Sequence, residues 1–132
     1  MSTRPSRRVV TLTANPSLDR TLALPGPLAR GGVARLAPSS TEPGGKGVNV
    51  ARAAAAAGGE VLTVLPAADD DPMVRALLGL ALPMATVPVT APVRTNCTLA
   101  EPDGTTTKLN EPGAPLDAAA RDALAAALHE HA

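Results

Sequence analysis

The sequence contains no phenylalanine, tyrosine or tryptophan and a single cysteine, Cys97, among its 132 residues. Without aromatic rings it has nothing to stack on nucleic-acid bases, and its 12 basic and 12 acidic residues leave no positive excess for a phosphate backbone. One cysteine excludes an intrachain disulfide and a cysteine-rich zinc site. No apolar run approaches the ~20 residues that a membrane helix needs. We therefore expect no nucleic-acid or membrane partner and a reducing, cytoplasmic setting.

Large hydrophobic side chains are also scarce. Hydrophobic residues make up 45% of the chain, but 27 residues are alanine, which brings only one methyl group each. Since a buried methylene contributes about 0.8 kcal/mol, such a core is thin. The length allows one domain or a large piece of one. We expect poor solubility and poor stability of these residues on their own.

The order of hydrophobic runs and turn residues predicts an α/β fold after a disordered start at residues 1–8. Glycine, proline and asparagine separate the elements, and residues 38–43 are expected to be a loop. A strand buried on both faces is predicted over residues 9–14 and further strands over 60–65 and 84–89. Helices are predicted over 48–57, 72–81 and 116–129, and short β segments over 21–24, 33–36, 95–100 and 105–109. The last two of these segments flank Pro102-Asp103-Gly104, which indicates a hairpin.

Three consecutive acids, Asp69-Asp70-Asp71, stand before Pro72. A metal site is one interpretation of them. A helix start explains the same residues, because Asp71 is a good N-cap and Pro72 suits the first helical position, and we favour it. His129 and His131, the only histidines, flank Glu130 at the end of the chain, where we expect them to be solvated and to bind no metal.

The stretch Gly44-Gly45-Lys46-Gly47 leads into the alanine-rich helix, whose first turn holds Asn49. Its glycines allow close approach to a ligand, and the helix start offers unpaired amides beside the Lys46 cation. These features suit a polyhydroxylated, anionic ligand. The stretch is neither a Walker loop, which needs Ser or Thr after the lysine, nor a Rossmann fingerprint. The local pattern leaves a ligand site and an ordinary glycine turn equally open.

Residues 44–52, Gly-Gly-Lys-Gly-Val-Asn-Val-Ala-Arg, closely resemble the first signature of the phosphofructokinase-B, or ribokinase-like, family of sugar kinases. Residues 11–19 resemble the family's opening strand and its Asn-Pro-x-x-Asp turn. The stretches 94–96 and 103–113 follow in the family's order, a combination typical of the 1-phosphofructokinase and tagatose-6-phosphate kinase branch. The resemblance implies that residues 9–132 are the N-terminal part of a three-layer αβα domain. A small β-sheet lid would be built from about 21–36 and 95–109.

The resemblance also implies substrate-binding roles for seven residues: Asp19, Gly44, Gly45, Lys46, Asn49, Arg94 and Arg35. Asp19 would bind sugar hydroxyls, since a carboxylate can accept two hydrogen bonds from a vicinal diol. Arg94 would hold the phosphate that the substrate already carries, a task that suits a planar guanidinium. Gly44, Gly45 and Asn49 would contact the sugar, with Lys46 and Arg35 assisting.

The activity that the resemblance implies is ATP-dependent phosphorylation of a ketohexose phosphate, with Mg²⁺ neutralising charge. We expect conversion of fructose 1-phosphate to fructose 1,6-bisphosphate, and a homodimer formed through the lid. A tagatose-6-phosphate kinase is the alternative within the branch. A non-catalytic remnant that binds sugar phosphate or dimerises is the alternative outside it, and a nucleotide-binding module is disfavoured because neither phosphate-loop pattern fits.

Two departures from the family limit this expectation. Family members are more than twice this length, and the 132 residues lack the Asp-x-x-Gly-Ala-Gly-Asp type motif whose last Asp is the family's catalytic base. We therefore expect no catalytic residue, no tight ATP or Mg²⁺ binding and no turnover from these residues alone. Leu65 to Asp71 also replaces a turn that is usually rich in glycine.

Overall fold

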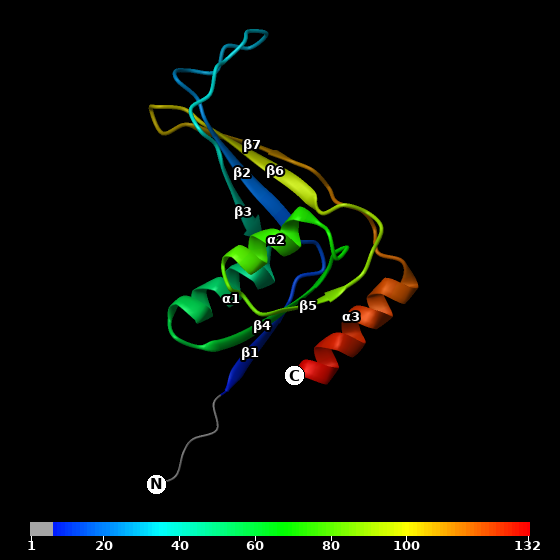
Figure 1. Ribbon diagram of the computed structural model, residues 1–132. Coiled ribbons are helices and arrows are strands. Elements are labelled where there is room, and N and C mark those ends of the chain that lie inside the picture. Colours follow the sequence, from blue (N-terminus) through cyan, green and yellow to red (C-terminus); the bar gives the residue numbers. More distant parts are fainter. Residues whose placement is uncertain (1–6) are drawn as a thin grey trace.

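A computed structural model describes residues 7–132, which form seven strands and three helices (Figure 1). In chain order these are β1 (Arg8–Leu12), β2 (Ser17–Ala23), β3 (Ser40–Gly44), α1 (Lys46–Ala56), β4 (Glu60–Pro66), α2 (Pro72–Gly79), β5 (Met84–Val87), β6 (Arg94–Ala100), β7 (Thr106–Asn110) and α3 (Ala118–His131). Of the expected disordered start, residues 1–6 lie outside the described residues. Arg8 already belongs to β1, one residue before the predicted start.

The core sheet has the strand order β1-β4-β5, and all its strands are parallel. Its central strand β4 is buried from Val61 to Pro66, as a strand covered on both faces must be. Helices α1 and α2 pack on one face, where Val48, Leu65, Met73 and Leu77 are fully buried. Helix α3 covers the other face through Leu124 (Figure 1). The three layers confirm the α/β fold predicted from the sequence.

The lid sheet has the order β3-β2-β6-β7 and extends away from the three helices (Figure 1). Strands β2 and β6 are parallel, whereas β3 and β7 pair with them antiparallel. Strands β6 and β7 form the predicted hairpin, with the Glu101 amide donating to the Thr105 carbonyl at 2.9 Å. Ser17, Gly44, Arg94 and Asn110 all lie at the end of this sheet that joins the core.

The prediction for the second lid strand was wrong. Residues 33–36 form no strand but belong to an exposed loop beyond the outer end of the lid, where Val33 is 92% exposed. The expected loop at 38–43 instead contributes β3, which pairs with β2 from Ser40 to Gly44. This strand is polar and contains Pro43, so it lacks the hydrophobic alternation that identifies a strand. It tolerates proline because it lies at a sheet edge.

The helix starts follow from their capping residues. Asp71 precedes α2 and accepts a hydrogen bond from the Met73 amide at 2.8 Å, with Pro72 in the first helical position, so the predicted cap is confirmed. Helix α1 begins at Lys46, two residues earlier than expected, directly after Gly45. Within residues 7–132, no helix combines the length and the apolar character needed to cross a bilayer.

Candidate functional site

Asp19 lies directly against the glycine bend. It belongs to β2, and its Oδ1 accepts a hydrogen bond from the hydroxyl of the buried Ser17 at 2.8 Å. Ser17 pairs with Gly44, the last residue of β3. The carboxylate fills the space that a side chain at position 44 would need, since a Cβ there would lie 2.6 Å from the Asp19 Cγ. Only glycine therefore fits at position 44 while Asp19 keeps this orientation.

The bend itself is packed against the end of β1. Gly45 has a φ of +113°, a conformation that favours glycine, and a Cβ there would lie 2.5 Å from the Thr13 Cγ2. A Cβ on Gly47 would lie 2.6 Å from the Leu12 carbonyl oxygen. No side chain caps the start of α1, so its first amides stay available to a ligand, and these carry the positive end of the helix dipole.

The two polar residues expected from the first turn of α1, Lys46 and Asn49, are both exposed. The Asn49 amide donates to the Gly45 carbonyl at 2.9 Å, the first hydrogen bond of the helix. Arg52, one turn later, reaches Glu42 of β3 at 3.5 Å and ties the helix to the strand before the bend. Lys46 and Asn49 therefore both lie in the first turn of α1 with their side chains exposed.

Arg94, the first residue of β6, is held by main-chain carbonyls. Its Nη1 donates to Glu111 at 3.2 Å and its Nη2 to Asn15 at 3.3 Å, while its Nε is buried without a partner among the described residues. Gly113, with a φ of +81°, packs against this arginine, since a Cβ at position 113 would lie 3.3 Å from the Arg94 Cδ. The Asn15-Pro turn and the stretch after β7, two separate parts of the family resemblance, therefore meet at Arg94.

The strand register places Asp19 and Arg94 on one face of the lid sheet. Ser17 pairs with Arg94 in β6, and Asp19, two residues further along β2, pairs with Asn96. Paired residues and residues two apart share a face, so these side chains form one polar surface. Asn96 has a buried Oδ1 without a partner among the described residues. The sequence analysis did not select Asn96 or Ser17, although their spacing of two from Arg94 and Asp19 could have indicated them.

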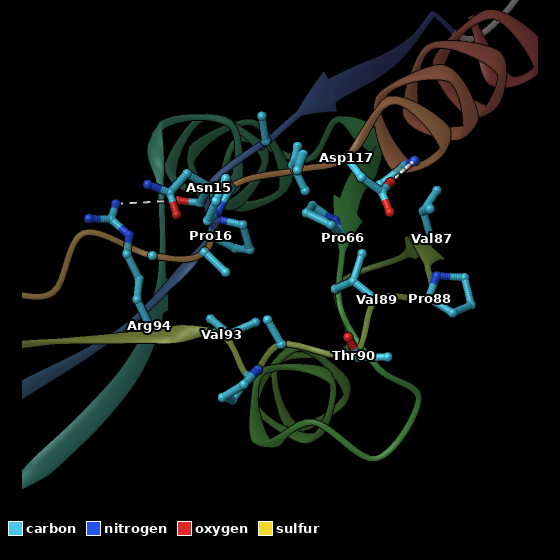
Figure 2. A pocket seen from close by; sticks show the side chains of 18 of the residues that line it. Asn15, Pro16, Pro66, Val87, Pro88, Val89, Thr90, Val93, Arg94 and Asp117 are labelled. Carbon is cyan, nitrogen blue, oxygen red and sulfur yellow. Dashed lines mark hydrogen bonds between the residues drawn. The ribbon is translucent and has the colours of Figure 1, made fainter.

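A cavity of about 500 Å³ lies between the ends of the core strands, the start of α3 and the base of the lid (Figure 2). Figure 2 shows Asn15 and Arg94 at one side of it, joined by their hydrogen bond, and Asp117 at the other. Of the seven predicted site residues, only Arg94 lines this cavity. Arg35 lies in the exposed part of the loop that follows Leu24, beyond the outer end of the lid and far along the strands from the glycine bend.

The aspartate triplet before α2 does not form a metal centre. Asp71 is buried as the helix cap, whereas Asp69 and Asp70 are exposed. Across residues 7–132, no three His, Cys, Asp or Glu side chains gather closely enough to hold a metal ion.

No protein-family model matches the chain, and no curated protein does. Solved structures do match it. Ribokinase from Thermotoga maritima, 20% identical, superposes with a TM-score of 0.65 over 80% of this chain and 37% of its own, which defines the fold as ribokinase-like. Phosphofructokinase-2 from Escherichia coli in complex with fructose-6-phosphate is 32% identical, with a TM-score of 0.85. A protein from Thermotoga maritima described as a possible 1-phosphofructokinase is 25% identical, with a TM-score of 0.75.

These structures confirm the resemblance seen in the sequence: the chain belongs to the phosphofructokinase-B, ribokinase-like family of kinases. The match to the Escherichia coli enzyme covers 93% of this chain but 41% of that enzyme. For the Thermotoga maritima 1-phosphofructokinase relative the shares are 92% and 40%. The chain thus spans about two fifths of the length of these relatives.

Proposed function

We propose that the protein phosphorylates a ketohexose phosphate at the expense of ATP and that these 132 residues hold the sugar. The observation that carries the proposal is the contact of the Asp19 carboxylate with Gly44 on the lid face that also bears Arg94. Fructose 1-phosphate is the first candidate, from the sequence motifs. Fructose 6-phosphate is the second, because the Escherichia coli relative was solved with it.

Each residue contributes a distinct contact in this proposal. The Asp19 carboxylate accepts hydrogen bonds from two sugar hydroxyls, which charge assistance strengthens. The uncapped amides at the start of α1, with Lys46 and Asn49 beside them, bind the polar edge of the sugar. Arg94 donates two of its five N–H groups to main-chain carbonyls, and its other N–H groups donate to the phosphate that the substrate already carries.

ATP and Mg²⁺ remain part of the proposal for the whole protein. The residues described here offer no cluster that fits a metal ion, so no step is assigned to one. The 132 residues also contain no Gly-Ala-Gly-Asp stretch to supply a catalytic base. We propose that these residues position the sugar in the cytoplasm without carrying out the phosphoryl transfer themselves.

The lid face opposite Asp19 supports a homodimer in the same proposal. It carries Leu22, Leu99 and Cys97 of the central strands and Leu109, which is 57% exposed. The Escherichia coli relative has a tetrameric inhibited form, so at least one family member self-associates. We propose that two copies of this chain meet through the leucines of this lid face, which also carries the exposed Arg20 beside Cys97.

Calorimetry tests the sugar site directly. The 132-residue chain is titrated with fructose 1-phosphate, fructose 6-phosphate, tagatose 6-phosphate and fructose, and the two candidates are ranked by affinity. Asp19→Ala should weaken binding at least tenfold, about 1.4 kcal/mol, while Asp122→Ala on the exposed surface of α3 should leave it unchanged. ADP formation should not exceed a control without sugar. If the chain binds none of the sugar phosphates, the proposed sugar site is wrong. If the chain shows measurable turnover, the proposal that these residues do not carry out phosphoryl transfer is wrong.

A further inference from the structure

Asp71 does more than cap a helix. Its Oδ1 accepts from the Met73 amide at 2.8 Å, as an N-cap should, while its Oδ2 accepts from the Val93 amide at 3.0 Å. Asp71 is only 5% exposed, so both bonds lie away from solvent. The second bond joins residues 22 positions apart and fastens α2 to the connection between the core sheet and the lid.

The residue that this second bond fixes stands directly before Arg94. Val93 ends the connection 88–93, which leaves β5 at the core and enters β6 at the base of the lid. Fixing the Val93 amide therefore fixes the point from which the Arg94 side chain starts. The far end of that side chain is already held by the carbonyls of Asn15 and Glu111. The guanidinium is thus constrained at both ends.

We propose that Asp71 is a positioning residue that holds Arg94 in place to receive the phosphate of the substrate. The inference rests on the proposed function, in which Arg94 binds that phosphate. A carboxylate suits the position because it presents two acceptor oxygens to two amides that face it from different elements.

Asp71→Ser separates the two bonds. A serine hydroxyl still caps α2, because serine is a preferred N-cap, but its single oxygen cannot also reach Val93. Asp103→Ser is the control, since Asp103 accepts a hydrogen bond from the Thr105 amide at 2.9 Å in the outer hairpin of the lid, away from Arg94 and its cavity. Each variant is measured by calorimetry with a sugar phosphate and with unphosphorylated fructose, alone and combined with Arg94→Met. The Val93 amide resonance is followed by NMR in every variant, and the Arg94 resonances in each variant that keeps Arg94.

We expect Asp71→Ser to weaken binding of the sugar phosphate about tenfold and binding of fructose less than twofold. In the Arg94→Met background, Asp71→Ser should not weaken binding of the sugar phosphate any further. The control should change neither. Equal losses for both sugars, or a loss that persists beside Arg94→Met, would make the role merely structural and overturn the inference. If the unaltered chain binds no sugar phosphate, the proposed function fails by itself. The NMR spectra then decide the inference, which is wrong if Asp71→Ser leaves the Arg94 resonances in place.

Discussion

The two sheets of the chain are stabilised in opposite ways. In the core sheet, β4 is buried along six of its seven residues, between α1 and α2 on one face and α3 on the other. In the lid sheet, β6 is half-buried throughout and β7 is exposed throughout. The core holds together through apolar side chains, whereas the lid holds together mainly through strand pairing. The residues proposed to bind substrate gather where the two meet.

This difference in burial explains how the lid sheet, the less buried of the two, can carry residues proposed to bind substrate. Because one face of the lid sheet is polar and uncovered, Asp19, Arg94 and Asn96 are half-buried there and are not enclosed between two layers, as they would be in a sheet covered on both faces. The cost is that the lid depends on its junctions with the core. Stability and binding should therefore respond to mutations in different sheets.

The largest effect is expected from the core. Leu65→Ala removes a fully buried side chain from β4 and leaves a cavity between β4 and the helices α1 and α2, so we expect a loss of about 2–5 kcal/mol in the free energy of unfolding. Urea denaturation measures it. Leu109→Lys in the lid should cost less than about 0.5 kcal/mol, because that side chain is 57% exposed.

The Leu109→Lys variant also tests the comparison between the core sheet and the lid sheet through its effect on self-association. Sedimentation velocity should show that Leu109→Lys shifts the chain toward a monomer, since a charge then enters the proposed dimer face. A stable dimer in the variant would contradict the proposed interface. A large loss of folding stability in the variant would contradict the contrast between the sheets.

The next effect concerns the junction. Gly44→Ala forces a methyl group into the space of the Asp19 carboxylate, which must turn away. We expect at least tenfold weaker binding of the sugar phosphate in calorimetry. Gly26→Ala is the control, because a Cβ there meets nothing within 4 Å. Equal binding by both variants would show that the orientation of Asp19 is unimportant.

The smallest effect belongs to the outer hairpin. The Thr105 amide and hydroxyl, which hydrogen-bond to Asp103, lower the pKa of that carboxyl from its ordinary value. A lowered pKa means that the ionised form stabilises the fold above the unfolded-state value of about 4, and that this contribution disappears as the pH falls through the folded-state pKa. Asp103→Ala should therefore lower the melting temperature slightly at pH 7 and not at pH 2. A difference that survives at pH 2 would indicate another cause.

The sequence predicts the core sheet better than the lid, for a physical reason. Strand β4 and the cap at Asp71 carry local signals, hydrophobic runs and a capping aspartate, that need no knowledge of the rest of the chain. Strand β3 has no such signal, because its residues form a strand only by pairing with β2. The contact of Asp19 with Gly44 and the bond from Val93 to Asp71 join distant residues, so neither could be read from local spacing.

The chain passes between the two sheets four times, and every passage falls at the same end of the lid: after β1, at the glycine bend, through residues 88–93 and after β7. The lid is therefore joined to the core at one end only and could be exchanged as a unit. A transplanted lid would carry Asp19, Arg94 and Asn96 with it, while Lys46, Asn49 and the uncapped helix amides would stay behind. Sugar recognition is thus divided between two parts that could be exchanged independently, and a chimaera must match them at Gly44, Val93 and Gly113.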